Sequence, residues 1–164
     1  MRDSDILISS RGGAYSVKVS GRANFEYAVP LRNIAKTGAA CNVLIDLKDC
    51  TAMDSTFMGV LTMLALKNKK SNAVVELYNA GAVLQKLLRD LGVIKLFVFK
   101  EGEPGGAAGS VEANAPADRL STAETVAEAH KTLVDADESN REKFRSVIDF
   151  ADADVVRLKK EPNL

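Results

Sequence analysis

The first hundred residues alternate between short apolar runs and longer stretches with helical periodicity. Residues 6–9 and 15–20 alternate apolar and polar positions on either side of Arg11-Gly12-Gly13, which predicts a β-hairpin that ends at Gly21. Further segments are short, largely apolar and rich in β-branched or aromatic residues, which is typical of strands buried in a sheet. These segments are residues 43–47, 73–78 and 96–99.

Three stretches with helical spacing separate the predicted strands. Asn24 is the expected N-cap of a helix that reaches Lys36 or Thr37 and stops at Gly38, with Pro30 either delaying its start or kinking it. Residues 55–69 and 83–91 predict two more amphipathic helices. The order β-β-α-β-α-β-α-β indicates an α/β fold, in which helices pack on a single mixed β-sheet.

The composition changes after residue 100. Gly, Ala and Pro fill 11 of the 20 positions in residues 101–120, which is typical of a linker. Ser121 and Glu124 form a predicted capping box for one helix, and a second helix is expected from about Ser139. We therefore expect a domain at 1–100, a linker at 101–120 and a two-helix extension at 121–164.

Charge divides the chain in the same place. The 22 basic and 22 acidic residues cancel overall, but residues 1–100 carry +6 and residues 101–164 carry −6. This division predicts electrostatic attraction between the two parts. The apolar stripes of the extension are too wide to remain in water, so they cover the same chain, form a homodimer contact or bind another partner.

Several classes of protein are excluded by composition. No apolar run approaches the roughly 20 residues that a transmembrane helix needs, and the N-terminus lacks the pattern of a signal peptide, so a cytoplasmic location is expected. The basic residues are scattered and aromatic residues make up only 5% of the chain, which argues against nucleic-acid binding. Cys41 and Cys50 have no neighbouring ligands for a metal, and no cofactor-binding loop is present.

The stretch that suggests chemistry follows the strand at residues 43–47. Asp54, Ser55 and Thr56 precede a helix, whose first backbone N–H groups would stabilise a phosphate on either hydroxyl. The same residues are also ordinary helix caps. Residues 1–100 contain no histidine to act as a base, which argues against an enzyme using these hydroxyls as nucleophiles. His130 is interpreted as a packing residue between the C-terminal helices, with a pH- or contact-sensitive role as the alternative.

Residues 5–100 resemble the STAS domain, the family of bacterial anti-sigma-factor antagonists. The family motif, D-S-[ST]-G-x-G between a strand and a helix, is present here as residues 54–59, with Phe57 in place of the first glycine. Val19-Ser20-Gly21, followed by a helix that carries Leu31-Arg32, also matches the family.

The resemblance implies a phosphorylation site and a partner-binding surface. Thr56 would be phosphorylated by a partner kinase, with Ser55 as the weaker candidate. Phe57 would either alter which kinase fits or pack inward. The residues implied in partner binding are Asn24, Asp54, Ser55, Phe57 and Met58.

The mechanism implied by the family is partner switching in transcription regulation. The unphosphorylated protein binds an anti-sigma serine/threonine kinase and frees the sigma factor, and phosphorylation releases the kinase because added charge disrupts the interface. A serine/threonine phosphatase is a second candidate partner. The alternative function is a non-switching STAS scaffold, in a signalling complex or accessory to a transporter, which Phe57 and the long extension favour.

Overall fold

The computed structural model describes residues 5–11, 14–37, 41–104, 111–112 and 118–161. Strands β1 (Asp5–Arg11) and β2 (Ala14–Ala23) form the predicted antiparallel hairpin, whose Gly12-Gly13 turn lies outside the described residues. The expected end at Gly21 is wrong. Gly21 has φ of +77°, which glycine adopts without strain, and the register shifts there, so the strand bends and continues to Ala23.

The strands form one mixed sheet, as predicted. The sheet has the order β6-β5-β3-β2-β1-β7, with β4 paired to the end of β2. Strands β2, β3, β5 and β6 are parallel to one another, and β7 is antiparallel to β1. The sequence pattern missed two short strands, β4 and β7. The bounds of the later strands are β3 Val43–Asp46, β4 Cys50–Met53, β5 Val75–Tyr78, β6 Val98–Lys100 and β7 Val111–Glu112.

The three helices of the N-terminal part also follow the prediction. Helix α1 begins directly after Asn24 and includes Pro30, so the proline does not delay its start. The predicted stop at Gly38 lies outside the described residues. A single 3-10 turn, η1 (Ile94–Leu96), precedes β6. The helices are α1 Phe25–Thr37, α2 Ser55–Lys69 and α3 Ala82–Asp90.

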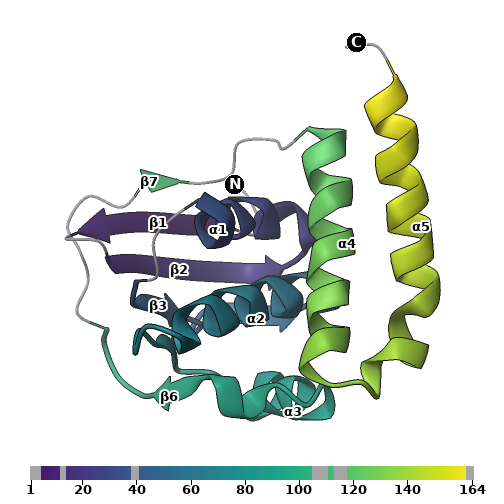
Figure 1. The fold of residues 1–164 in the computed structure, drawn as a ribbon. Helices are drawn as coiled ribbons and strands as arrows, with labels where there is room; N and C mark the ends of the chain where they lie inside the picture. The colour runs from purple at the N-terminus through teal and green to yellow at the C-terminus, as the bar shows by residue number, and fades with distance from the viewer. Residues whose placement is uncertain (1–4, 12–13, 38–40, 105–110, 113–117, 162–164) are drawn as a thin grey trace.

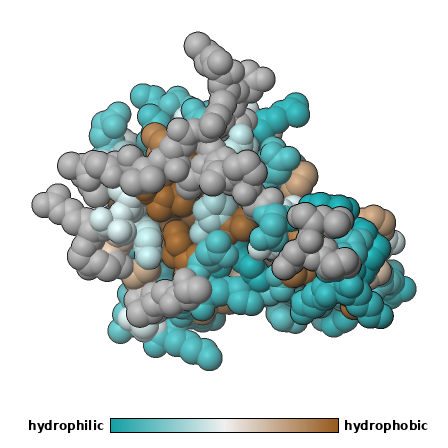
Figure 2. Space-filling model, turned by 90° about the horizontal axis from the view of Figure 1, so that it is seen from above, coloured by the Kyte–Doolittle hydropathy of each residue, from teal (hydrophilic) through white to brown (hydrophobic). Residues whose placement is uncertain are grey.

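The extension consists of α4 (Arg119–Ala136) and α5 (Asn140–Lys160), which pack side by side (Figure 1). The predicted capping box at Ser121 is wrong, because the N-cap is Asp118, whose side chain accepts the Ser121 N–H at 2.6 Å. The side of the molecule formed by these helices is mostly hydrophilic in Figure 2. None of the helices in the described part of the chain is long and apolar enough to cross a membrane.

Helix α4 packs against α1 and α2 of the same chain (Figure 1). Its Ala129 and Leu133 are fully buried and belong to the same hydrophobic core as Ile45 and Leu77 of the central strands. Of the three arrangements left open by the sequence, the structure shows the first, in which the extension covers its own chain. The predicted linker therefore connects two parts in direct contact.

Candidate functional site at the N-terminus of helix α2

Asp54 joins the beginnings of two helices. One oxygen of its carboxylate accepts the Phe57 N–H of α2 at 2.8 Å, and the other accepts the Phe25 N–H of α1 at 2.8 Å. Burial raises the pKa of Asp54, while these two N–H donors and nearby His130 act in the opposite direction. Asn24 caps α1 separately, since its side-chain oxygen accepts the Glu26 N–H at 2.9 Å. The predicted loop residues therefore fix the positions of both helix N-termini.

The residues after Asp54 are mostly buried. Thr56 is 5% exposed, Phe57 is fully buried and Met58 is 4% exposed. Of the two alternatives for Phe57, the structure shows the inward one, in which the ring belongs to the core. In this conformation, Phe57 and Met58 offer almost no surface to a partner, and Ser55 is the more accessible of the two hydroxyl residues.

His130 of α4 forms a hydrogen bond to Ser55. The Nδ1 atom of His130 lies 2.7 Å from the Val126 carbonyl oxygen, which can only accept, so Nδ1 carries the proton. Burial lowers the pKa of His130, which keeps the ring neutral. Its Nε2 atom is therefore an acceptor, and the Ser55 hydroxyl donates to it at 2.8 Å.

Residues 1–100 contain no histidine, as the sequence argument stated, but the structure brings one to the hydroxyl pair from the extension. This histidine is 75 residues away from Ser55 along the chain. The Ser55 hydroxyl, the His130 ring and the Val126 carbonyl are arranged like a nucleophile, a base and the group that orients the base. However, His130 is only 2% exposed and its ring contacts Phe144 edge-on, with ring centroids 4.8 Å apart. The pair is a buried structural hydrogen bond in this conformation, and the predicted packing role of His130 is confirmed.

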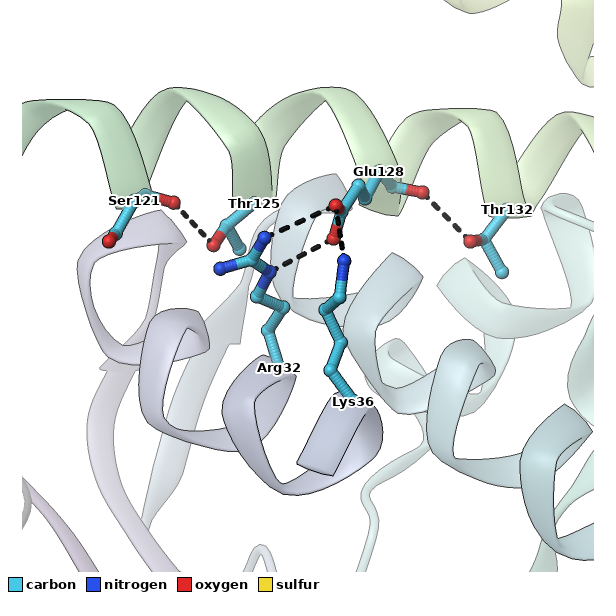
Figure 3. Close-up of polar contacts among 6 residues, drawn as sticks. All are labelled: Arg32, Lys36, Ser121, Thr125, Glu128 and Thr132. Carbon is cyan, nitrogen blue, oxygen red and sulfur yellow. Dashed lines mark hydrogen bonds and ion pairs between the residues drawn. The ribbon is translucent and has the colours of Figure 1, made fainter. Parts of the chain in front are cut away.

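A charged cluster joins α4 to α1 next to this pair. Arg32 Nε and Nη2 donate to the two carboxylate oxygens of Glu128 at 2.9 and 3.2 Å, and Lys36 Nζ lies 2.8 Å from the same carboxylate (Figure 3). The Arg32 side chain is only 9% exposed. The hydrogen bond to Glu128 raises the pKa of Arg32, although burial acts to lower it. Burial acts to raise the pKa of Glu128, but the hydrogen bonds and charges of Arg32 and Lys36 outweigh it and lower that pKa. The predicted attraction between the basic and acidic parts is concentrated in this cluster.

Glycine allows α2 and α4 to approach closely. A Cβ atom added to Gly59 would lie 2.5 Å from the Ala129 carbonyl oxygen and 2.7 Å from the Ala129 Cβ, both on α4. These distances are too short for any real side chain. Gly59 is the last residue of the family motif found in the sequence. In this chain, its missing side chain makes room for the extension.

A separate cavity lies where α1, α4 and α5 meet. Its volume is about 380 Å³, and Phe25 and Phe150 lie at its border, 41% and 76% exposed. The other lining residues are small, apolar or oppositely charged: Arg119, Thr122, Ala123, Val126, Ala151 and Asp154. The cavity does not include the hydroxyl pair, so it is distinct from the predicted site.

Comparison with known proteins finds similarity in structure only. A candidate anti-sigma factor antagonist from Thermotoga maritima superimposes with a TM-score of 0.50 and 13% identity, over 59% of this chain and 86% of that one. About 60% of the chain therefore has a SpoIIAA-like, or STAS, fold. No model of a known protein family matches the sequence, and no curated protein matches it either.

Two further solved structures are similar over a comparable share of the chain. The anti-sigma factor antagonist SpoIIAA, in its unphosphorylated form, gives a TM-score of 0.49 and 12% identity, over 61% of this chain and 89% of its own. An uncharacterised Shewanella loihica protein with a SpoIIAA-like fold gives 0.40 and 19%, over 64% and 90%. Helices α4 and α5 lie beyond the part of the chain that the SpoIIAA-like fold covers.

Proposed function

We propose that this chain is a partner-switching module of the anti-sigma-factor antagonist type, which acts in the bacterial cytoplasm. It binds an anti-sigma serine/threonine kinase when unphosphorylated and releases it when Thr56, or less favourably Ser55, is phosphorylated. A serine/threonine phosphatase would restore the binding form. The observation that carries the proposal is the N-terminus of α2, where a pair of hydroxyl residues directly follows the capping residue Asp54 in a SpoIIAA-like fold.

The electrostatics of this N-terminus suit a switch. A phosphate on Ser55 or Thr56 would lie at the positive end of the α2 dipole, which favours the modified state. It would also lie beside the Asp54 carboxylate and would add roughly two negative charges to the partner surface. A partner selected for the neutral hydroxyl would then face like-charge repulsion and a large desolvation cost, which explains release without any catalytic step by this chain.

The test uses the serine/threonine kinase encoded nearest to this chain's gene. The protein is incubated with that kinase and ATP, and the phosphate is mapped by mass spectrometry. We expect a single phosphate on Thr56, lost in Thr56→Ala and retained in the matched control Ser55→Ala. Thr56→Glu should weaken kinase binding roughly tenfold or more, since it places a charge at the interface. A phosphate mapped outside residues 55–56, or none at all, would refute the proposal.

A second candidate function is a non-switching scaffold. The observation that favours it is the burial of Thr56 and Phe57, which leaves little of the implied switch residues on the surface. A scaffold would form a stable assembly, for example a homodimer through the C-terminal helices, whose size is insensitive to Thr56→Glu. Light scattering coupled to size-exclusion chromatography separates the two candidates, because the switch predicts a partner-dependent change and the scaffold predicts none.

A further inference from the structure

Helix α4 lies on the surface that the proposed switch needs for its partner. Three contacts bring α4 there: His130 with the Ser55 hydroxyl, Glu128 with Arg32 and Lys36, and Ala129 with Gly59 (Figure 3 shows the second). They lie on consecutive residues of α4, at positions 128, 129 and 130. One turn of α4 therefore contacts Ser55 of the hydroxyl pair and the neighbouring face of α1.

We infer that the α4–α5 extension is an autoinhibitory cover that competes with the protein partner for the face of α1 and α2. This inference rests on the proposed function, since it assigns the partner to that face. In the covered state neither the kinase nor any other protein can dock on the N-terminus of α2. In the open state the extension has moved away as a unit, and the Asp54-capped hydroxyl pair becomes accessible.

The chemistry of the contact favours a displaceable cover. Within residues 128–130, a glycine and an alanine provide the closest approach, and they bury little apolar area compared with leucine or phenylalanine. Leu133, one turn further along α4, is buried in the core, and its contacts must also be given up when the cover opens. The remaining contacts of this turn are hydrogen-bonded or ionic, and water or a partner can satisfy the same groups once α4 has moved. Arg32 and Lys36 also specify the partner, since an acidic group must replace Glu128 between them. We therefore assign to this face a partner helix with a carboxylate beside a small residue.

The extension has internal contacts that would survive the movement. His130 packs on Phe144, and Lys131 forms an ion pair with Asp152 at 2.7 Å. The Asn140 side chain donates to the Leu133 carbonyl at 2.8 Å and also to the Leu91 carbonyl, beside α3, at 2.9 Å. The first three contacts join α4 to α5 or to the turn between them. The Leu91 bond ties the first residue of α5 to the sheet domain, where it would provide a pivot.

Covering and phosphorylation exclude one another. The Ser55 oxygen is 2.8 Å from a neutral ring nitrogen that can only accept, so a phosphate there would meet a lone pair and a buried ring. Thr56 is 5% exposed, so a phosphate on it also requires the structure around it to open. A phosphorylated chain is therefore held open, and the extension can return only after the phosphate has been removed.

The first experiment displaces α4 by adding a side chain at its closest contact with α2. Gly59→Ala places a methyl group against the α4 backbone, while Gly81→Ala, whose added Cβ has no neighbour within 4 Å, is the matched control. Hydrogen exchange of the full chain is measured by mass spectrometry. We expect α4 and α5 amides to exchange at least roughly tenfold faster than those of β3 and β5, and a further tenfold increase in Gly59→Ala alone. The inference is overturned if α4 and the sheet exchange at equal rates in the parent chain and Gly59→Ala changes both rates by the same factor.

A charge reversal tests the same movement independently. Glu128→Arg places a third cation beside Arg32 and Lys36, and should accelerate exchange of α4 and α5 without affecting β3 and β5. Adding Arg32→Glu restores opposite charges across the contact and should return most of the protection. The autoinhibitory cover is contradicted if Glu128→Arg does not accelerate exchange of α4 and the double variant exchanges at the same rate as the single variant.

The second arm adds the neighbouring kinase and ATP. If the inference and the proposed function both hold, Gly59→Ala and Glu128→Arg bind the kinase at least roughly tenfold more tightly than the parent chain and Gly81→Ala. If exchange shows that α4 opens in the variants, but the kinase neither binds nor phosphorylates them, the proposed function is refuted and the movement of the extension is still supported. Equal kinase binding by the parent and the opened variants refutes the autoinhibitory role while the proposed function survives.

Discussion

Two buried regions of this molecule are held together by different chemistry. The core between the helices and the sheet consists of large side chains that are fully buried, such as Ile45, Leu61 and Leu77. The contact of α4 residues 128–130 with α1 and α2 consists of a glycine, an alanine, a hydroxyl–imidazole bond and an ion cluster. Each large side chain contributes roughly 1.5–3 kcal/mol by burial, whereas a typical hydrogen bond contributes about 1 kcal/mol net. Two regions that are equally buried can therefore differ in how much free energy is needed to open them.

The largest expected effect comes from the core. Leu77→Ala in β5 removes a fully buried side chain far from α4 and should destabilise the whole chain by roughly 2–5 kcal/mol, because a cavity remains. Denaturant unfolding followed by circular dichroism measures the change. Hydrogen exchange in the sheet and in α4 should accelerate together. Acceleration confined to β5 would show that the core is not cooperative.

A smaller and local effect is expected at the hydroxyl–imidazole pair. Ser55→Ala leaves the buried Nε2 atom of His130 without a donor and should weaken docking of α4 by about 1–2 kcal/mol. The change should accelerate exchange in α4 and α5 while exchange in β3 and β5 stays the same. The double variant Ser55→Ala with His130→Phe removes both polar partners and should recover much of the loss. If it recovers nothing, the hydrogen bond is not what holds the contact.

The pH dependence of docking is the next effect in size. His130 is neutral when buried, with a pKa lowered by burial, and returns to about 6.5 when exposed. The docked form therefore has its full stability above about pH 6.5 and loses it as pH falls towards the lowered pKa, since the open form binds the proton. Asp54 faces His130, and its raised pKa favours the folded form only at lower pH. Exchange of α4 between pH 7.5 and 5.5, corrected for intrinsic rates, should show this loss, and His130→Gln should abolish it.

The smallest effect on stability is expected on the outer face of α5. Phe150 is 76% exposed, so Phe150→Ser should change unfolding by less than about 0.5 kcal/mol. It should nevertheless reduce any self-association through the C-terminal helices, because it removes the largest exposed apolar group there. Sedimentation velocity over a range of concentrations measures this, with Phe25→Ser as the comparison on α1. A dimer that survives both substitutions uses another surface.

Local patterns predicted most of the fold. The apolar spacing of residues 55–69 and the signals around Asn24 fixed two helices almost to the residue, because their caps and periodicity are local. Strand β4 was missed since Thr51 and Ala52 are exposed and show no alternation, and β7 since it lies in a segment rich in Gly and Ala. Asp118 was missed as an N-cap because Ser121, three residues later, offers the same chemistry.

The site was predicted only in its local part. The cap by Asp54 and the hydroxyl pair follow from neighbouring residues, but the bond from His130 to Ser55 joins positions 75 apart and has no local signal. The charge division of the chain did indicate that the two parts attract one another, and the Glu128 cluster is where they do. It could not identify the glycine at 59 as the point of closest approach, because that depends on the crossing of two helices.

The carboxylate of Asp54 has a mechanical consequence. By accepting an N–H from the first residue of α1 and another from α2, it clamps the two helix ends at a fixed separation. If this face binds a partner as proposed, its surface is rigid before any encounter, and little ordering entropy remains to be lost there. Under the inferred cover, affinity would then depend on how often the face is vacant, and regulation would act through the fraction of time the extension is away rather than through reshaping of the site.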